Sequence, residues 1–210
     1  MIDTLLVLTV LVGLYMLGTM ELASAIRATA LQGILLALLP TLVHGSFGWH
    51  ATAMGIATVA LKVVLIPRML MSAMRRAGVV REIEPLIGFG ASVTIAGGLI
   101  ALSIAFGQRL QVPGAHISQL LVPCAFATVL IGLLILVSRS KALSQVTGYL
   151  VLENGIFLFG LVLVREMPLL VELGILLDVF VAVFIMGIVI HHISREFDHI
   201  DTHVMTTLHD

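Results

Sequence analysis

Glu153, Asp178 and Lys62 are ionisable side chains set deep within long apolar runs of this chain. Glu153 follows eight mostly apolar residues of Gln145–Val164, and together with Asn154 it interrupts an otherwise apolar stretch. In hydrocarbon, a charged side chain costs about 2.5–3.5 kcal/mol if it faces lipid, and such residues usually mark a functional site. These three groups must therefore face protein, water or one another.

The chemistry open to these groups is proton exchange. Removal from water favours the neutral forms of both a carboxyl group and an ammonium group, which brings their protonation equilibria toward neutral pH. Two carboxyl groups and one amine, with Asn154 as a neutral bridge, could form a proton relay. The alternative is that Lys62 pairs with Glu153 or Asp178 and only holds the helices together, as buried polar groups do in membrane proteins. Both interpretations are open at this point.

Composition identifies the class of protein. Hydrophobic residues make up 60% of the 210 residues, charged residues only 11%, and the mean hydropathy is +1.16. Soluble domains carry about 25% charged residues, so this chain could not cover a globule with polar surface. The net charge of −1, without a large basic block, argues against binding to nucleic acid. The sequence predicts an all-α integral membrane protein.

Seven apolar runs are long enough to cross a bilayer. A hydrocarbon core of about 30 Å requires roughly 20 residues of helix at about 1.5 Å each. The expected spans are Ile2–Leu22, Ala28–His44, Ala51–Met71, Leu86–Phe106, Leu120–Ser138, Gln145–Val164 and Leu169–His191. Because Glu21–Arg27 allows only a minimal turn, the first two spans should form a tight antiparallel hairpin, or this turn is helical and partly embedded in the membrane.

Arginine and lysine accumulate on the cytoplasmic side of membrane proteins and so set the expected orientation. With the N-terminus outside, the outer segments hold only Arg109 and Arg165. The inner segments hold eight basic residues, namely Arg27, Arg68, Arg75, Arg76, Arg81, Arg139, Lys141 and Arg195. Seven spans with the N-terminus out and the C-terminus in are therefore predicted.

The three ionisable groups should lie near one plane of the membrane. At helical rise, Glu153 lies roughly 12 Å from the inner end of its span, Asp178 roughly 14 Å from the outer end, and Lys62 roughly 16 Å into its span. Pro67 follows Lys62 by five residues, and it should kink that helix and free backbone carbonyls beside the charge.

The remaining candidates carry weaker signals. Glu172 is expected near the outer mouth and Glu21 at the inner end of the first hairpin, each in a supporting or interfacial position. Cys124 is a single thiol that cannot hold an iron–sulfur cluster and is best explained as a buried hydrophobe. His199 and His203 have the spacing of a metal pair without a matching carboxylate or thiol. With no nucleotide loop or catalytic motif, we expect no metal and no redox centre on this chain, and no catalysis by it alone.

Two patterns involve glycine. ALQGILLAL (Ala30–Leu38) resembles VLENGIFLF (Val151–Phe159), each with a polar amide and a glycine before an aliphatic run. Such matches also arise by chance in apolar sequence, so an ancestral duplication remains open. No strict GxxxG motif occurs, and close helix packing should rely on scattered Ala, Gly and Ser.

Spans five to seven, from Leu120 to about Ile190, resemble the small three-span NuoK subunit of respiratory complex I. That family has a span, a short basic cytoplasmic turn, a second span with a central glutamate and a third span with another acid. The corresponding features here are the turn SRSKA with Arg139 and Lys141, the central glutamate Glu153 and the later acid Asp178.

The chain as a whole resembles the hydrogenase-4 component E family, a longer member of this group. The phrases ALKVVLIPRML (Ala60–Leu70), GYLVLENGIFLFG (Gly148–Gly160) and EFDHIDT (Glu196–Thr202) carry this resemblance. It implies three parts: a four-helix membrane part over residues 1–118, a NuoK-like part over 119–194 and a cytoplasmic tail over 195–210.

The chain departs from the NuoK pattern at three points. Glu153 and Asn154 are adjacent, and adjacent helical positions point about 100° apart, so they cannot serve one path in the same way. The later acid is Asp178 rather than glutamate, which shortens its reach. Lys62 has no counterpart in the short subunit, and its role rests on depth alone.

The resemblance implies a non-catalytic membrane subunit of a group 4 [NiFe]-hydrogenase or formate hydrogenlyase-type complex in a prokaryotic cytoplasmic membrane. It would contribute to proton or sodium translocation beside a larger antiporter-like subunit. The nickel, iron and iron–sulfur clusters would belong to a separate peripheral arm. The alternatives are the small subunit of a multi-subunit cation/proton antiporter and a structural clamp between larger membrane subunits.

Overall fold

The computed structural model describes residues 1–44, 56, 59–76, 85–110, 118–163, 177, 179–181 and 183–187. Helices are the only regular elements within these ranges. The all-α prediction is therefore confirmed for this part of the chain. Of the expected spans, Leu169–His191 lies mostly outside the described residues, as do Asp178 and Glu172.

Two helical hairpins form the centre of the molecule. The first joins α1 (Ile2–Gly18) to α2 (Leu22–His44), and the second joins α6 (Leu121–Ser138) to α7 (Ala142–Leu163). Three residues separate the helices in each hairpin, and extended backbone at Thr19 ends α1. The tight first hairpin is confirmed, with its turn at residues 19–21. Leu22–Arg27 already belong to α2, so most of the segment expected as the turn is helical, as the alternative allowed.

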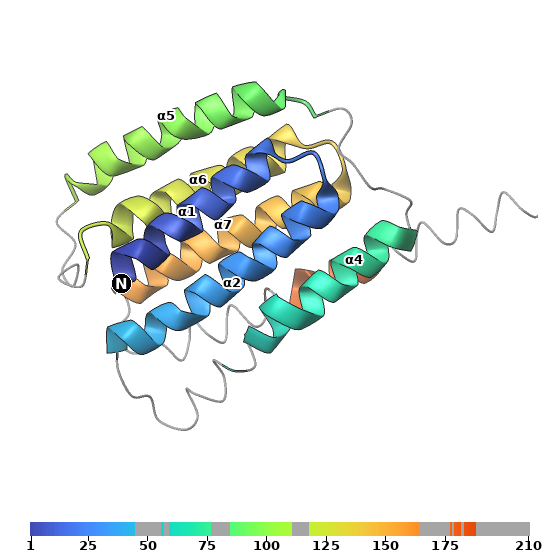
Figure 1. Cartoon of the computed structure of the whole chain (residues 1–210), viewed down its shortest axis with the longest axis horizontal. Helices are drawn as coiled ribbons and strands as arrows, with labels where there is room; N and C mark the ends of the chain where they lie inside the picture. Colours follow the sequence, from blue (N-terminus) through green and yellow to red (C-terminus); the bar gives the residue numbers. More distant parts are fainter. Residues whose placement is uncertain are drawn as a thin grey trace, which may run out of the picture.

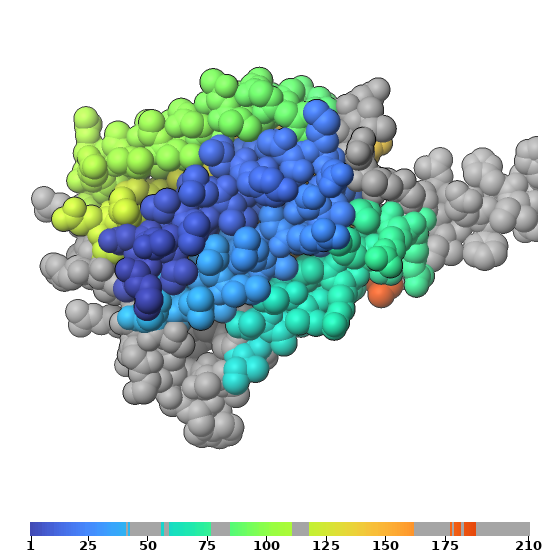
Figure 2. Space-filling view, viewed as in Figure 1, coloured from blue at the N-terminus to red at the C-terminus, as the bar shows by residue number. Residues whose placement is uncertain are grey.

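The hairpins lie side by side, with α1 against α6 and α2 against α7 (Figure 1). The helix α5 (Phe89–Gly107) covers α6 and α1 on one side of this group. On the other side, η1 (Ala60–Leu65) and α4 (Ile66–Arg76) form one uninterrupted helix that packs against α2. The space-filling view shows α4 alongside α2 (Figure 2).

Within the described residues, three helices are long and apolar enough to cross a membrane, judged by length and composition. They are Leu22–Pro40 within α2, Phe89–Gly107 and Leu121–Ser138, while α1 is a shorter apolar helix. Large apolar side chains such as Leu102 and Phe106 of α5 lie about half exposed, which suits a lipid-facing surface. These apolar helices support a membrane location for the protein. The count of seven spans and their orientation stay predictions.

Glycines bring α6 and α7 into backbone contact. A Cβ atom at three glycine positions would lie closer to the opposite helix than non-bonded atoms approach: 2.3 Å from Leu152 N at Gly132, 2.7 Å from Leu136 N at Gly148 and 2.5 Å from Val129 N at Gly155. Small residues allow this approach in membrane helices. The absence of a GxxxG motif thus does not prevent close packing, and scattered glycines supply it.

The two ends of the bundle differ in charge. The turn of each hairpin lies at the same end, where Glu21 and Arg139 line one pocket, and Arg27 at the start of α2 faces the arginines of α4. At the opposite end, Ser118 donates a 2.5 Å hydrogen bond to Asp3. Apart from Lys62 in the middle of the bundle and Arg109, which follows α5 at the other end, the described basic residues therefore gather at one end.

We expect Gly132→Ala to destabilise the fold. The new methyl group would meet backbone atoms of Leu152, so the helices must separate, and overpacking of this kind costs about 1–3 kcal/mol. Gly98→Ala on α5 is the matched control, since nothing lies within 4 Å of its Cβ position. Thermal unfolding in mild detergent should show a lower midpoint for Gly132→Ala and an unchanged or higher midpoint for Gly98→Ala. Equal midpoints would refute backbone contact at this position.

Candidate functional site

Glu153 and Asn154 lie in the middle of α7, almost completely buried. Their relative exposures are 4% and 3%, although both are polar and one is ionisable. The backbone contact between α6 and α7 fixes the position of this stretch, because Gly155 packs directly against Val129 of α6. The two side chains are therefore held on a rigid element rather than on a loop.

Lys62 reaches both side chains from a neighbouring helix. Its Nζ lies 2.8 Å from Glu153 Oε1 and donates a 3.1 Å hydrogen bond to Asn154 Oδ1. One ammonium group thus links two residues that point about 100° apart on their own helix. Their roles differ, as the sequence indicated, since one carries the counter-charge and the other only accepts a hydrogen bond. The pairing of Lys62 with Glu153 is one of the two pairings expected from depth.

The helix that carries Lys62 is irregular at this point. Residues Ala60–Leu65 form a π-helix, and the N–H of Ile66 donates to the carbonyl of Leu61. Pro67 has no N–H to give to the carbonyl four residues before it, so an α-helical ladder cannot continue through this turn. Single π-turns are rare and occur frequently at functional sites. The helix beside Lys62 thus contains a wider turn, whereas the kink at Pro67 and the freed carbonyls stay predictions.

From Asn154 a hydrogen-bonded chain continues across the bundle. Asn154 Nδ2 donates to Gln32 Oε1 at 3.0 Å, and Gln32 Nε2 donates to the backbone carbonyl of Thr9 at 3.0 Å. Gln32 is fully buried, like the Thr9 side chain. We call Glu153, Lys62, Asn154 and Gln32 the polar chain. It connects η1, α7, α2 and α1 through the interior of an otherwise apolar bundle.

Glu153 is the least satisfied member of the polar chain. Both of its carboxylate oxygens are buried without a hydrogen bond among the described residues; Oε1 has the ion-pair contact with Lys62, and Oε2 has no such contact. A buried carboxylate oxygen without a hydrogen-bond partner destabilises the fold. An ion pair with only a structural role would gain nothing from such an oxygen. Groups of this kind in native proteins call for a functional explanation. Glu153 is therefore the group of this site best suited to exchange a proton or contact an ion.

Sequence reasoning missed Gln32 as a site residue. Placing an uncharged amide in hydrocarbon costs less free energy than placing a charge there. The depth of Gln32 in its apolar run was therefore a weaker indication of function. The signal that could have found it is the internal repeat, in which the pair Gln32–Gly33 corresponds to Asn154–Gly155 when the glycines are aligned. These two amides are hydrogen-bonded to each other. The repeat therefore points to a real contact, whatever its origin.

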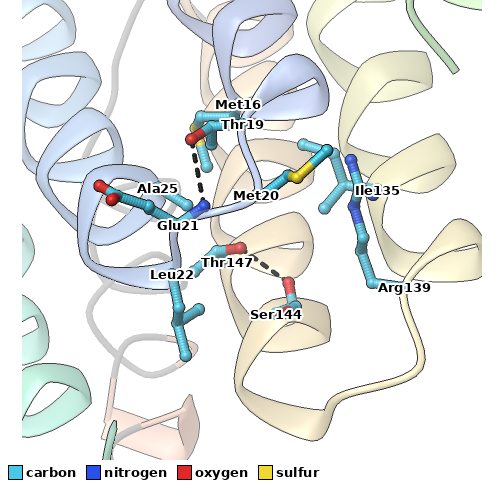
Figure 3. A pocket seen from close by; sticks show the side chains of 10 residues that line it. All are labelled: Met16, Thr19, Met20, Glu21, Leu22, Ala25, Ile135, Arg139, Ser144 and Thr147. Carbon is cyan, nitrogen blue, oxygen red and sulfur yellow. Dashed lines mark hydrogen bonds between the residues drawn. The ribbon is translucent and has the colours of Figure 1, made fainter. Parts of the chain in front are cut away.

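Glu21 lies away from the polar chain. It sits at the turn between α1 and α2, and its Oε2 accepts a 3.0 Å hydrogen bond from Ser24 Oγ. Figure 3 shows its carboxylate directed away from Arg139 across a narrow pocket. Glu153 lies eleven residues into α7, counted from Ala142, roughly 16 Å along that helix. The position of Glu21 fits the expected interfacial location at the end of the first hairpin.

The basic turn between α6 and α7 contains one buried and one exposed cation. Lys141 is exposed, but Arg139 is only 3% exposed. Arg139 Nη2 donates to the carbonyl of Leu17, and the guanidinium lies 4.3 Å from the centre of the Phe89 ring. A cation at the C-terminal end of α1 interacts favourably with the helix dipole. Arg139 therefore connects the two hairpins and α5. A turn that faced only solvent would make no such contacts.

Within the part of the chain that the structure describes, no three His, Cys, Asp or Glu residues are grouped as a metal site. Cys124 is buried in α6, as expected for a small hydrophobic side chain. His199 and His203 lie outside the described residues.

Hydrogenase-4 component E of Escherichia coli strain K12 is 32% identical to this chain over 162 residues, which cover 76% of this chain and 72% of that protein. The chain belongs to the hydrogenase-4 component E family. The family member of Shigella flexneri aligns with the same identity and coverage. The uncharacterized protein Rv0085 of Mycobacterium tuberculosis is 36% identical over 194 residues, covering 90% of this chain and 87% of that protein.

No family model matches the chain, and no solved structure matches it significantly. The resemblance of the whole chain to hydrogenase-4 component E is therefore confirmed by relatives alone. The resemblance of residues 120–190 to NuoK has no such support and stays a prediction, as does the division at residues 118 and 194.

We expect Lys62→Met to destabilise the protein more than Lys62→Met combined with Glu153→Gln. The single change leaves a buried carboxylate without its cation, and breaking a buried pair from one side costs about 3–5 kcal/mol. The second change removes the charge left behind. Thermal unfolding in detergent of wild type, both single variants and the double variant gives the coupling energy. Additive effects would show that the 2.8 Å contact carries no energy.

Proposed function

We propose that this chain is a membrane subunit of a hydrogenase-type complex and that its polar chain forms part of a proton or sodium path. Membership of the hydrogenase-4 component E family supports the first part, because that name describes a component of a hydrogenase. The single observation that supports the second part is the buried Glu153, paired with Lys62 on one oxygen only.

The contact between Lys62 and Glu153 is short enough for proton exchange. A separation of 2.8 Å between nitrogen and oxygen lies within hydrogen-bond distance, and rotation of the two side chains would align them without movement of either helix. Transfer from the ammonium to the carboxylate converts two buried charges into two neutral groups, and the reverse step restores them.

In this mechanism the two amides act as positioning residues. Asn154 accepts from Lys62, and Gln32 holds Asn154 in the rotamer that makes this possible. Amides do not take up protons at ordinary pH, so Asn154 and Gln32 orient and stabilise the ammonium rather than carry a charge. The relay would enter or leave through Glu153 Oε2. Asp178 remains the candidate for the next acid along the path.

The proposed setting is a prokaryotic cytoplasmic membrane with the N-terminus outside. The gathering of described basic residues at the end that holds both hairpin turns supports this orientation. We propose a larger antiporter-like subunit as the neighbour that continues the ion path. The nickel, iron and iron–sulfur clusters would belong to a peripheral arm. This subunit would not bind them, and it would couple the free energy of their redox reaction to ion movement.

A structural clamp is the second candidate function. The polar chain links four helical elements, so it could serve mainly to fix their arrangement. The buried Oε2 without a hydrogen bond among the described residues argues against this role, because a purely structural network is expected to leave no such oxygen unsatisfied. The multi-subunit cation/proton antiporter remains the alternative setting. Nickel and iron–sulfur absorbance in the complex isolated in mild detergent would separate it from the hydrogenase setting.

Glu153→Gln should uncouple the complex. The variant keeps the shape of the side chain but cannot exchange a proton, so hydrogen turnover should continue while the membrane potential that it generates falls at least tenfold. Glu21→Gln is the matched control, since it removes a carboxylate at the exposed end of the first hairpin. The measurement is hydrogen turnover together with a potential-sensitive dye in membrane vesicles.

The result distinguishes the two candidates. A Glu153→Gln complex that assembles and generates the wild-type potential would support the clamp and contradict the ion path. Uncoupling by Glu21→Gln to the same degree would show a general loss of integrity rather than a loss of the relay.

A further inference from the structure

The helix α4 is amphipathic in an unusual way for a membrane protein. Its buried side consists of Ile66, Leu70, Ala73 and Met74. Its other side carries Arg68, Ser72, Arg75 and Arg76, whose spacing of four, seven and eight residues places them on one face, and all four are exposed. The arginine face therefore points away from the core. The helix α2 lies beside it.

A groove runs between this face and the N-terminal part of α2. It is open to solvent on one side and has a volume of about 670 Å³. Its lining contains Arg27 from α2 and three arginines of α4, together with Ser72 and the apolar residues Ile26, Ala30, Val63, Val64, Pro67 and Met71. None of the described residues of this lining is acidic. The groove therefore concentrates positive charge over an apolar floor.

Charge and apolar surface are separated along the groove. Arg75 and Arg76 stand at the end of α4, whereas Val63 and Val64 belong to η1, roughly 20 Å away at helical rise. The arginines lie at the basic end of the bundle, where lipid headgroups are expected. The apolar walls continue toward the depth of Lys62, within the hydrocarbon. A free anion would use only the first part, whereas a phospholipid would use both.

We propose that this groove binds an anionic phospholipid. The phosphate would lie among Arg27, Arg68 and Arg75, because guanidinium groups bind phosphate oxygens through paired hydrogen bonds. An acyl chain would lie along Val63, Val64 and Met71. Basic pockets between membrane helices on the cytoplasmic side recognise anionic headgroups in this way. The proposal rests on the membrane location of the chain and is independent of the ion path.

The test uses the full chain purified in mild detergent. Cardiolipin, phosphatidylcholine and inorganic phosphate are added separately, and lipid retention by native mass spectrometry is measured beside the thermal midpoint. Cardiolipin should raise the midpoint of the wild type, and phosphatidylcholine and inorganic phosphate should not. The variant Arg68→Gln with Arg75→Gln should bind cardiolipin roughly 30-fold more weakly. Arg109→Gln, at the opposite end of the bundle, should bind it as the wild type does.

Each other outcome would overturn the proposal. An equal effect of phosphatidylcholine would show an apolar surface without headgroup recognition, and an equal effect of inorganic phosphate would show a free-anion site. Equal weakening by Arg109→Gln would show general attraction between opposite charges. Should the double variant unfold without lipid, Arg27→Gln on the opposite wall provides the second test, and undiminished cardiolipin retention by it would contradict the site.

Discussion

The contact between Lys62 and Glu153 is the interaction on which the interior of this protein depends. An ammonium and a carboxylate, each costly in hydrocarbon, meet at 2.8 Å between two different helices. Neither could occupy its position alone without a large free-energy penalty. Their pairing therefore fixes η1 against α7, and the rest of the buried polar structure follows from it. Asn154 completes the coordination of the ammonium, and Gln32 in turn orients Asn154.

The backbone geometry around this contact is specialised for it. Gly132, Gly148 and Gly155 let α6 and α7 touch, so the glutamate of α7 is presented from a rigid pair of helices. On the other side, the π-turn before Pro67 sets the direction of the lysine. The site is thus formed where a very closely packed hairpin meets an irregular helix. This combination limits the movement of both charged groups relative to each other.

Depth reasoning identified the acid and the lysine of this site from the sequence, because the cost of a charge in hydrocarbon leaves few acceptable positions. Gln32 was not identified in this way, because burying its neutral amide costs less free energy than burying a charge. The sequence also placed Arg139 in an ordinary basic turn, whereas the guanidinium binds the Leu17 carbonyl and stacks on Phe89. Such contacts join residues more than a hundred positions apart or in separate helices, and no local pattern encodes them.

The boundary of the first hairpin shows a related limit. Glu21–Arg27 looked like a polar turn, yet α2 begins at Leu22 and includes Ser24 and Arg27. Polar residues in the first turn of a helix at a membrane surface remain in contact with water, so polarity alone did not locate the turn. The extended backbone at Thr19 locates it, and backbone conformation at a single residue is weakly encoded in sequence.

Solid-state NMR of the membrane-embedded protein tests the central contact most directly. Lys62 and Lys141 are the two lysines of the chain, so ¹⁵N labelling of lysine with Lys141→Arg leaves a single side-chain nitrogen signal. With glutamate labelled by ¹³C at its carboxyl carbon, the account predicts strong dipolar coupling between Lys62 Nζ and one glutamate, lost in Glu153→Gln. Absence of coupling in the wild type, or its persistence in Glu153→Gln, would contradict the account.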